Sequence, residues 1–176
     1  MTNHYQKLIE SGEWGDGIAW ELYETSELPP EELCTAALCA AIIGNRVVLA
    51  CSERGWGVLG GHREDDETLA ETLKREAREE GGFVIDSHCL FAVCKVTARQ
   101  PIAHQQPDRT YPFPTSYMVY YWATTKAGLQ VPTGQEILES GSFDLDALPP
   151  LNPLDQAVIE AGWEAYQITT RDSHED

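Results

Sequence analysis

Apolar residues along the chain form strand-like runs, interrupted by one stretch with helical spacing. Two runs, Cys34–Ile43 and Arg46–Cys51, flank the dipeptide Gly44-Asn45. Apolar runs on both sides of a Gly-Asn turn predict a β-hairpin. A glycine-rich bend is expected at 56–61. Three further segments rich in apolar, β-branched and aromatic residues predict strands at 83–85, 89–96 and 116–124.

The helical stretch extends from about residue 66 to residue 80. Leu69, Leu73 and Ala77 recur every four residues and form one apolar stripe. Asp65 or Asp66 is expected to cap the helix start, and Gly81-Gly82 is expected to end it.

A second helix is predicted over 154–168, after a loop at 98–114 that carries four prolines. Its buried side is expected to consist of Leu154, Val158, Ala161 and Ala165. Strands and two helices therefore interleave along the chain. This order favours an α+β fold in which helices sandwich a mixed β-sheet.

Residues 1–33 precede the first long apolar run and form an acidic, aromatic-bearing N-terminal extension. Trp14 and Trp20 are among its aromatic residues, and Pro29-Pro30 closes it. A packing hairpin, a dimer contact and a flexible arm are all open for this segment. A length of 176 residues suits one domain with such additions.

The charge is strongly negative, since 12 Lys and Arg stand against 29 Asp and Glu, a net charge of −17. Such a chain repels nucleic-acid backbones and anionic membranes, so neither is expected as a partner. A small phosphorylated substrate stays open if divalent cations mediate its binding. No apolar run approaches the ~20 residues of a membrane span, and the start lacks signal-peptide features.

The five cysteines are odd in number and include no Cys-x-x-Cys pair. They are interpreted as reduced thiols, which predicts a cytoplasmic protein. Four of them lie in apolar stretches and are expected to be small core residues: Cys34, Cys39, Cys89 and Cys94.

Glutamates gather beside the apolar stripe of the first helix. At 100° per residue, Glu76, Glu79 and Glu80 share an arc of about 100°. Like charges at this spacing repel each other, and a hard divalent cation such as Mg²⁺ would offset the repulsion. Gly60-Gly61 shortly precedes the helix, where a backbone carbonyl could join the carboxylates on a metal.

The spacing of these residues resembles the Nudix box. Gly61 is followed after five residues by Glu67, and after seven more by the segment Arg75–Phe83, REAREEGGF. This resemblance implies the Nudix fold, a mixed sheet between helices. The domain is then expected over 34–170, with 171–176 as an acidic tail.

The resemblance also implies metal-dependent hydrolysis of a nucleoside diphosphate linked to another moiety. By position, Glu76, Glu79, Glu80 and the Gly60 carbonyl would hold Mg²⁺ or Mn²⁺. Glu67 and Arg75 would orient the helix carboxylates. Glu79 is the preferred general base and Glu76 its rival. An acid of a later loop is a further alternative, with Glu136, Glu139 and Asp144 as candidates.

Substrate contacts are expected from a few cationic and aromatic residues. Arg54 and Arg63 are candidates for phosphate, and Trp56, Tyr111 and Phe113 for a base, although core packing is equally open for Trp56. The segment Tyr111–Ser116, YPFPTS, resembles part of a motif of NADH pyrophosphatases.

These observations predict a pyrophosphohydrolase that acts on a nucleoside triphosphate or a related nucleotide. An activity like that of NADH pyrophosphatases is an alternative, and so is a sensor that binds nucleotides without turnover. Because the chain is so acidic, removal of an RNA cap is the least favoured activity. Homodimerisation through the N-terminal aromatic residues is also considered.

Overall fold

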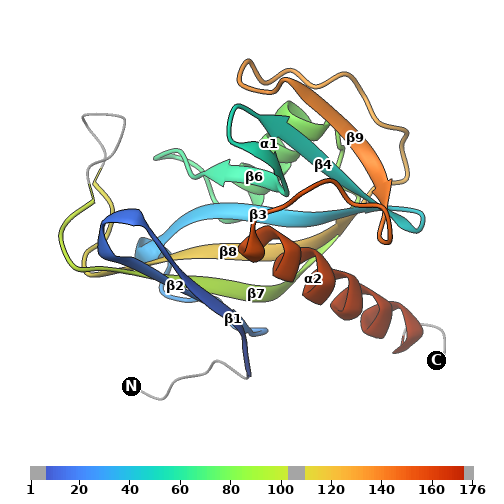
Figure 1. Ribbon diagram of the computed structural model, residues 1–176. Helices are drawn as coiled ribbons and strands as arrows, with labels where there is room; N and C mark the ends of the chain where they lie inside the picture. The colour runs from blue at the N-terminus through green and yellow to red at the C-terminus, as the bar shows by residue number, and fades with distance from the viewer. Residues whose placement is uncertain (1–6, 103–109, 173–176) are drawn as a thin grey trace.

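The computed structural model describes residues 7–102 and 110–172, and its elements build one mixed sheet between two helices (Figure 1). The sheet has nine strands in the order β1-β2-β7-β8-β3-β4-β5, with β6 beside β3 and β9 beside β4. The strands are β1 Lys7–Trp14, β2 Ile18–Glu24, β3 Cys34–Ile43, β4 Arg46–Ser52, β5 Gly55–Gly57, β6 Leu59–His62, β7 Ser87–Ala98, β8 Thr115–Thr124 and β9 Glu139–Asp144.

Strand β3 is the centre of the sheet. One edge of β3 pairs in parallel with β8, and the other edge is divided between β6 and β4. The predicted hairpin between β3 and β4 is confirmed, with Gly44 at a φ of +63° in its turn. Strands β6 and β4 pair with different parts of the same edge of β3. Strand β6 can therefore lie next to the first helix while β4 continues the sheet.

The two helices cover opposite faces of the sheet. Helix α1 (Leu69–Gly81) packs its buried stripe of Leu69, Leu73 and Ala77 against one core, as predicted. Helix α2 (Pro153–Asp172) packs Leu154, Val158 and other residues against a second core on the far face. The α+β class and the sandwich of helices around a mixed sheet are therefore confirmed.

The start of α1 differs from the prediction. Thr68, rather than Asp65 or Asp66, is the N-cap, and it forms a capping box with Glu71. The Thr68 hydroxyl accepts from the Glu71 N–H, and the Glu71 carboxylate accepts from the Thr68 N–H, so two amide groups at the helix start are satisfied. The end of α1 is as predicted, because Gly82 is the C-cap in the left-handed conformation at a φ of +58°.

Residues 7–24 form a hairpin that extends the sheet. Strands β1 and β2 pair with each other, and β2 pairs with β7 over its full length from Ile18↔Ala98 to Glu24↔Ala92. Of the three arrangements open for the N-terminal extension, the described part has the packed hairpin. Residues 1–6 and most of the expected acidic tail lie outside the described residues.

Three predictions of local structure, one strand, one bend and one loop, are wrong. Residues 83–85 form no strand, because the backbone after Gly82 leaves the helix in an irregular segment. The bend at 56–61 lies within the short strands β5 and β6. The region of Glu139 and Asp144 is not a loop, since β9 pairs with β4 from Cys51↔Glu139 to Arg46↔Asp144.

None of the five cysteines forms a disulfide. Cys34, Cys39 and Cys94 are buried as predicted, and burial raises the pKa of the Cys34 thiol to about 11. The prediction that Cys89 lies in the core is wrong, because Cys89 is exposed near the start of β7. Within the described residues, neither helix is long and apolar enough to cross a membrane.

Candidate active site

The glutamates of α1 face the two glycines of β6. Glu80 Oε2 accepts a hydrogen bond of 2.8 Å from the backbone N–H of Gly60. A Cβ atom on Gly61 would lie 2.6 Å from Glu76 Oε1, so a larger residue would displace this carboxylate from its position. Gly60 has a φ of +143°, and a Cβ there would lie 2.4 Å from the Leu38 Cα. Gly61 therefore allows α1 to approach β6 closely, and Gly60 allows β6 to approach β3 closely.

Arg75 joins the carboxylates of this region into one network. Its Nε donates to Glu67 Oε1 at 2.5 Å, and its Nη2 donates to Glu67 Oε2 at 2.9 Å. Its Nη1 donates to Glu76 Oε1 at 2.7 Å and to Glu79 Oε2 at 3.2 Å. Nη2 also donates to the backbone carbonyl of His62 at 3.1 Å. One guanidinium therefore fixes the relative positions of the loop, α1 and β6.

Burial and the Arg75 guanidinium act on these carboxylates in opposite directions. Burial raises the pKa of Glu80 to about 7, against the hydrogen bond from Gly60, which lowers it. Burial also raises the pKa of Glu76, although Arg75 opposes the shift. The hydrogen bonds from Arg75 lower the pKa of Glu67 to about 2. A further positive charge beside Glu76 and Glu80 would therefore stabilise the ionised forms of these two carboxylates.

The chemistry of the donors fits a hard divalent cation. Glu76, Glu79 and Glu80 offer oxygen atoms alone, which Mg²⁺ and Mn²⁺ prefer. One guanidinium faces several carboxylates here, so negative charge is in excess. Within residues 7–102 and 110–172, however, no three acidic, His or Cys side chains already converge on one point. Instead, the carboxylates of Glu76 and Glu79 accept hydrogen bonds from Arg75, and the carboxylate of Glu80 accepts one from the Gly60 N–H.

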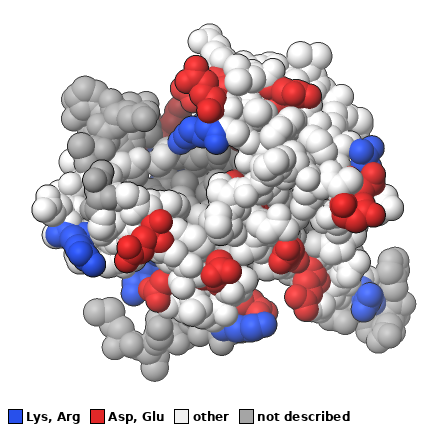
Figure 2. All heavy atoms as spheres, viewed as in Figure 1, with Lys and Arg blue, Asp and Glu red and all other residues white. Residues whose placement is uncertain are grey.

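A cavity of about 600 Å³ lies beside this cluster. Arg54 and Glu136 line it, and both also act electrostatically on Glu80. The face in Figure 2 is hollowed next to a small basic patch, whereas acidic side chains are spread over the surface. The other lining residues come from six strands, α2 and loops: Trp14, Ile18, Thr35, Leu38, His62, Val96, Ile102, Tyr111, Ser116, Met118, Tyr120, Asn152, Leu154 and Asp155.

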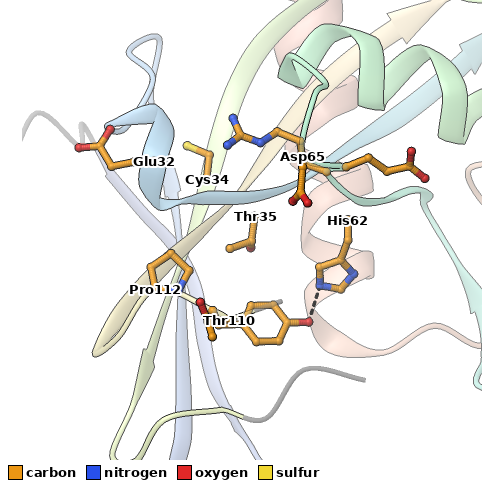
Figure 3. A pocket seen from close by; sticks show the side chains of 10 residues that line it. Glu32, Cys34, Thr35, His62, Asp65, Thr110 and Pro112 are labelled. Carbon is orange, nitrogen blue, oxygen red and sulfur yellow. Dashed lines mark hydrogen bonds between the residues drawn. The ribbon is translucent and has the colours of Figure 1, made fainter. Parts of the chain in front are cut away.

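A second cavity of about 270 Å³ shares a wall with the first. His62, Tyr111 and Thr35 line both cavities. Figure 3 shows the contact in this wall, where the Tyr111 hydroxyl and His62 Nε2 form a hydrogen bond of 2.8 Å. His62 thus connects Tyr111 to Arg75 through its own backbone carbonyl.

The predicted substrate residues fall into two groups. Arg54 and Tyr111 line the large cavity, and Arg63 lines the smaller one, where it pairs with Glu31 at 3.0 Å. Trp56 instead packs edge-on against Phe143 at 4.9 Å and joins the core. Phe113 is 52% exposed and lines neither cavity.

The three late acids are also separated. Glu136 lines the large cavity beside Glu80, whereas Glu139 lies on β9 and lines neither cavity. Asp144, at the other end of β9, pairs with Arg46 at 3.4 Å. Among the three, Glu136 is the acid for which the structure supports a role beside the α1 carboxylates, because its charge acts on Glu80.

Sequence reasoning did not find Asp155, at the start of α2. Its carboxylate is mostly buried, and this burial raises its pKa to about 6 although Asn152 donates to it. The adjacent Asn152-Pro153 marks a helix start in the sequence. A helix start does not reveal that the side chain faces a cavity formed by other strands.

The NUDIX domain model matches residues 33–162, so the chain belongs to the Nudix family. The NAD-capped RNA hydrolase NudC of Pseudomonas aeruginosa is 34% identical over 112 residues, which are 61% of this chain and 35% of that protein. The chain thus spans about a third of the length of this relative.

Solved structures show the same fold. The Bacillus subtilis pyrophosphohydrolase BsRppH has a TM-score of 0.55 and 17% identity, over 89% of this chain and 91% of that chain. The NUDIX domain of Shewanella oneidensis NrtR, solved with ADP ribose, has a TM-score of 0.53 and 18% identity, over 76% and 88%.

Proposed function

We propose that this protein is a metal-dependent pyrophosphohydrolase that cleaves the diphosphate of a small nucleotide. The observation that carries the proposal is the close packing of α1 against β6, with Glu76 over Gly61 and Glu80 on Gly60. Buried, crowded carboxylates beside a cavity are costly unless a cation offsets them. Membership of the Nudix family supports the same chemistry.

In this proposal Glu76, Glu79, Glu80 and the Gly60 carbonyl hold Mg²⁺ or Mn²⁺. The bound cation would neutralise the diphosphate and lower the pKa of a water molecule. Glu79 accepts the proton of the attacking water, and its side chain is 41% exposed, against 14% for Glu76. Arg75, held by Glu67, keeps Glu76 and Glu79 in place and is a positioning residue.

A dinucleotide such as NADH is the second candidate within this class of substrate. The similarity to NudC, whose name describes an NAD-capped RNA hydrolase, favours it. The segment Tyr111–Ser116 also supports it, because Tyr111 and Ser116 line the cavity beside the carboxylates. The charge of −17 favours a free dinucleotide over one attached to RNA.

A nucleotide sensor that shares the fold but lacks turnover is the contrasting function. The complete network of Glu67, Arg75, Glu76 and Glu79 argues against it, because binding alone does not need a positioned base. A homodimer and a cytoplasmic location stay proposals that rest on the sequence alone.

The test is a panel of substrates, assayed for release of phosphate or monophosphate with and without Mg²⁺. The panel contains nucleoside triphosphates, oxidised nucleotides, nucleotide sugars, NADH, ADP-ribose and dinucleoside polyphosphates. We expect metal-dependent turnover of at least one member and a loss of about 10²- to 10⁴-fold in Glu79→Gln.

Glu164→Gln, on the exposed surface of α2, is the matched control and should keep full activity. Full turnover by Glu79→Gln would remove Glu79 from the proposed role. Binding of nucleotides without any product would favour the sensor.

A further inference from the structure

The β1–β2 hairpin contributes to the large cavity although it lies outside the family match. The match begins at residue 33, whereas Trp14 and Ile18 of the hairpin line the cavity. In Figure 1 the hairpin borders the sheet on the side of β7. The family resemblance therefore assigns no role to these residues, but the fold places them at the cavity.

The hairpin is fixed firmly enough to hold a side chain in place. Strand β2 pairs with β7 at seven positions, from Ile18↔Ala98 to Glu24↔Ala92. Trp20 is 4% exposed, and Gly12 leaves room for its ring, because a Cβ there would lie 2.6 Å from Trp20 Cζ2. The rings of Trp14 and Trp20 lie 6.3 Å apart, so a buried neighbour supports Trp14.

Trp14 itself stays accessible. It is 40% exposed, although it is a large aromatic residue next to a well-packed core. An exposed ring on the wall of a cavity has one face available to a planar ligand.

The cavity has the size and lining of a site for a nucleoside. Its volume of about 600 Å³ lies within the range of small-molecule sites. Apolar side chains such as Ile18, Val96 and Met118 line it together with polar groups. Arg54 and Glu136 line the cavity and also act electrostatically on Glu80. A diphosphate bound over the α1 carboxylates would therefore direct the attached nucleoside into this cavity.

We infer that Trp14 binds the base of the substrate by stacking, and that the β1–β2 hairpin is a specificity element of the active site. This inference rests on the proposed function, since it assumes that the diphosphate lies at the α1 carboxylates. Trp14 supplies the aromatic surface, and Ile18 beside it extends the apolar wall. Of the aromatic residues expected from the sequence to contact a base, Tyr111 also lines this cavity, whereas Trp56 packs against the core.

The test compares binding of a base with binding of phosphate alone. Calorimetry in the presence of Mg²⁺ measures the affinities of AMP, GMP, CMP and UMP, and of inorganic pyrophosphate. In Trp14→Ala we expect the affinity for the tightest-binding monophosphate to fall about tenfold, as loss of a stacked ring implies. The affinity for pyrophosphate should stay within about twofold, and Trp14→Phe should recover most of the lost affinity.

Leu8→Ala is the matched control, because Leu8 is an exposed apolar residue of the same hairpin that does not line the cavity. It should leave both affinities unchanged. Equal binding of the monophosphate by Trp14→Ala and by the wild type would overturn the inference. A parallel loss of monophosphate and pyrophosphate binding would also overturn it, as would a wild type that binds no monophosphate.

Size-exclusion chromatography separates the inference from the other role open to this residue. If the Trp14→Ala variant formed a smaller assembly than the wild type and kept its affinity for the monophosphate, Trp14 would be a dimer contact. This result would overturn the inference. Failure of the proposed function is distinguishable, because it would appear as no hydrolysis by the wild type. The binding comparison does not depend on turnover.

Discussion

Arg75 is the residue on which the geometry of the candidate site depends most directly. Its guanidinium contacts Glu67, Glu76, Glu79 and the carbonyl of His62, so it joins three segments of the chain. Glu67 holds it by two hydrogen bonds, and Glu67 in turn accepts from Thr72 at 2.9 Å. Charge-assisted bonds of this kind are stronger than neutral ones, so Glu67 contributes to stability as well as to geometry.

The Glu67–Arg75 pair predicts a specific dependence of stability on pH. The pKa of Glu67 is lowered to about 2, so folding favours its ionised form. The stabilisation is complete above about pH 4.5 and is lost as the pH falls toward 2. Glu67→Gln should lower the free energy of unfolding by about 1 to 3 kcal/mol at pH 7, and by less at pH 3.

Urea denaturation at the two pH values measures this difference. Glu13→Gln, an exposed glutamate of β1, is the control and should change neither value by more than about 0.5 kcal/mol. A loss in Glu67→Gln that is the same at both pH values would contradict the electrostatic explanation.

Residues of the box could be placed from the sequence because they are close along the chain. The spacing from Gly61 to Glu80 put the glycines and carboxylates together, and the structure places them in contact. Asp155 and Trp14 could not be found in this way. They reach the same cavity through packing of α2 and pairing of β2 with β7, which depend on distant partners.

At the scale of elements, α1 has local signals at both ends that fix its length. Thr68 and Glu71 form the capping box, with Glu71 Oε2 accepting from the Thr68 N–H at 2.8 Å. Gly82 ends the helix, and a Cβ there would lie 1.8 Å from the Gln130 carbonyl oxygen. The two caps therefore fix the length of the helix, whose C-terminal half carries the carboxylates that face β6.

The cap can be tested by substitution at the observed and the expected positions. Thr68→Ala should lower the free energy of unfolding by about 1 kcal/mol, because an amide at the helix start loses its acceptor. Asp66→Ala should change it by less than about 0.5 kcal/mol, since Asp66 lies before the cap. Urea denaturation measures both variants. A larger effect of Asp66→Ala than of Thr68→Ala would contradict the observed cap.

Some elements were predictable and others were not, for physical reasons. The β3–β4 hairpin and both helices follow from periodicity and from local turn or cap residues. Strand β9 was missed because its residues, ESGSFD, lack an alternating apolar pattern, and its pairing with β4 supplies the order. In the segment 83–85, Phe83 is buried in the core next to α1 and Ile85 packs against that core, whereas Val84 is exposed, and this packing needs no strand.

At the scale of the whole molecule, charge is the dominant property. The net charge is −17, and acidic side chains are spread over the face in Figure 2, with separate basic patches. Such a field repels polyanions at long range, and salt screens it. A small nucleotide with a bound cation is affected much less than a nucleic acid.

This charge predicts the order of two substrates that share the same dinucleotide. We expect kcat/KM for NADH to exceed that for an NAD-capped RNA by at least about tenfold at low salt. The rate for the RNA should rise as salt is raised from about 50 to 200 mM, because screening weakens repulsion. A steep fall over this range, as phosphate-binding proteins show, would contradict the prediction.

The pairing of β2 with β7 also determines how the chain can be divided. A fragment cut at the start of the family match would lack β2, and residues 92–98 of β7 would then form a sheet margin with free amide and carbonyl groups. Such a margin recruits strands from neighbouring molecules and promotes aggregation. Shortening the chain to residues 33–162 would thus remove Trp14 and Ile18 from the cavity wall and leave an aggregation-prone, unpaired strand edge on β7.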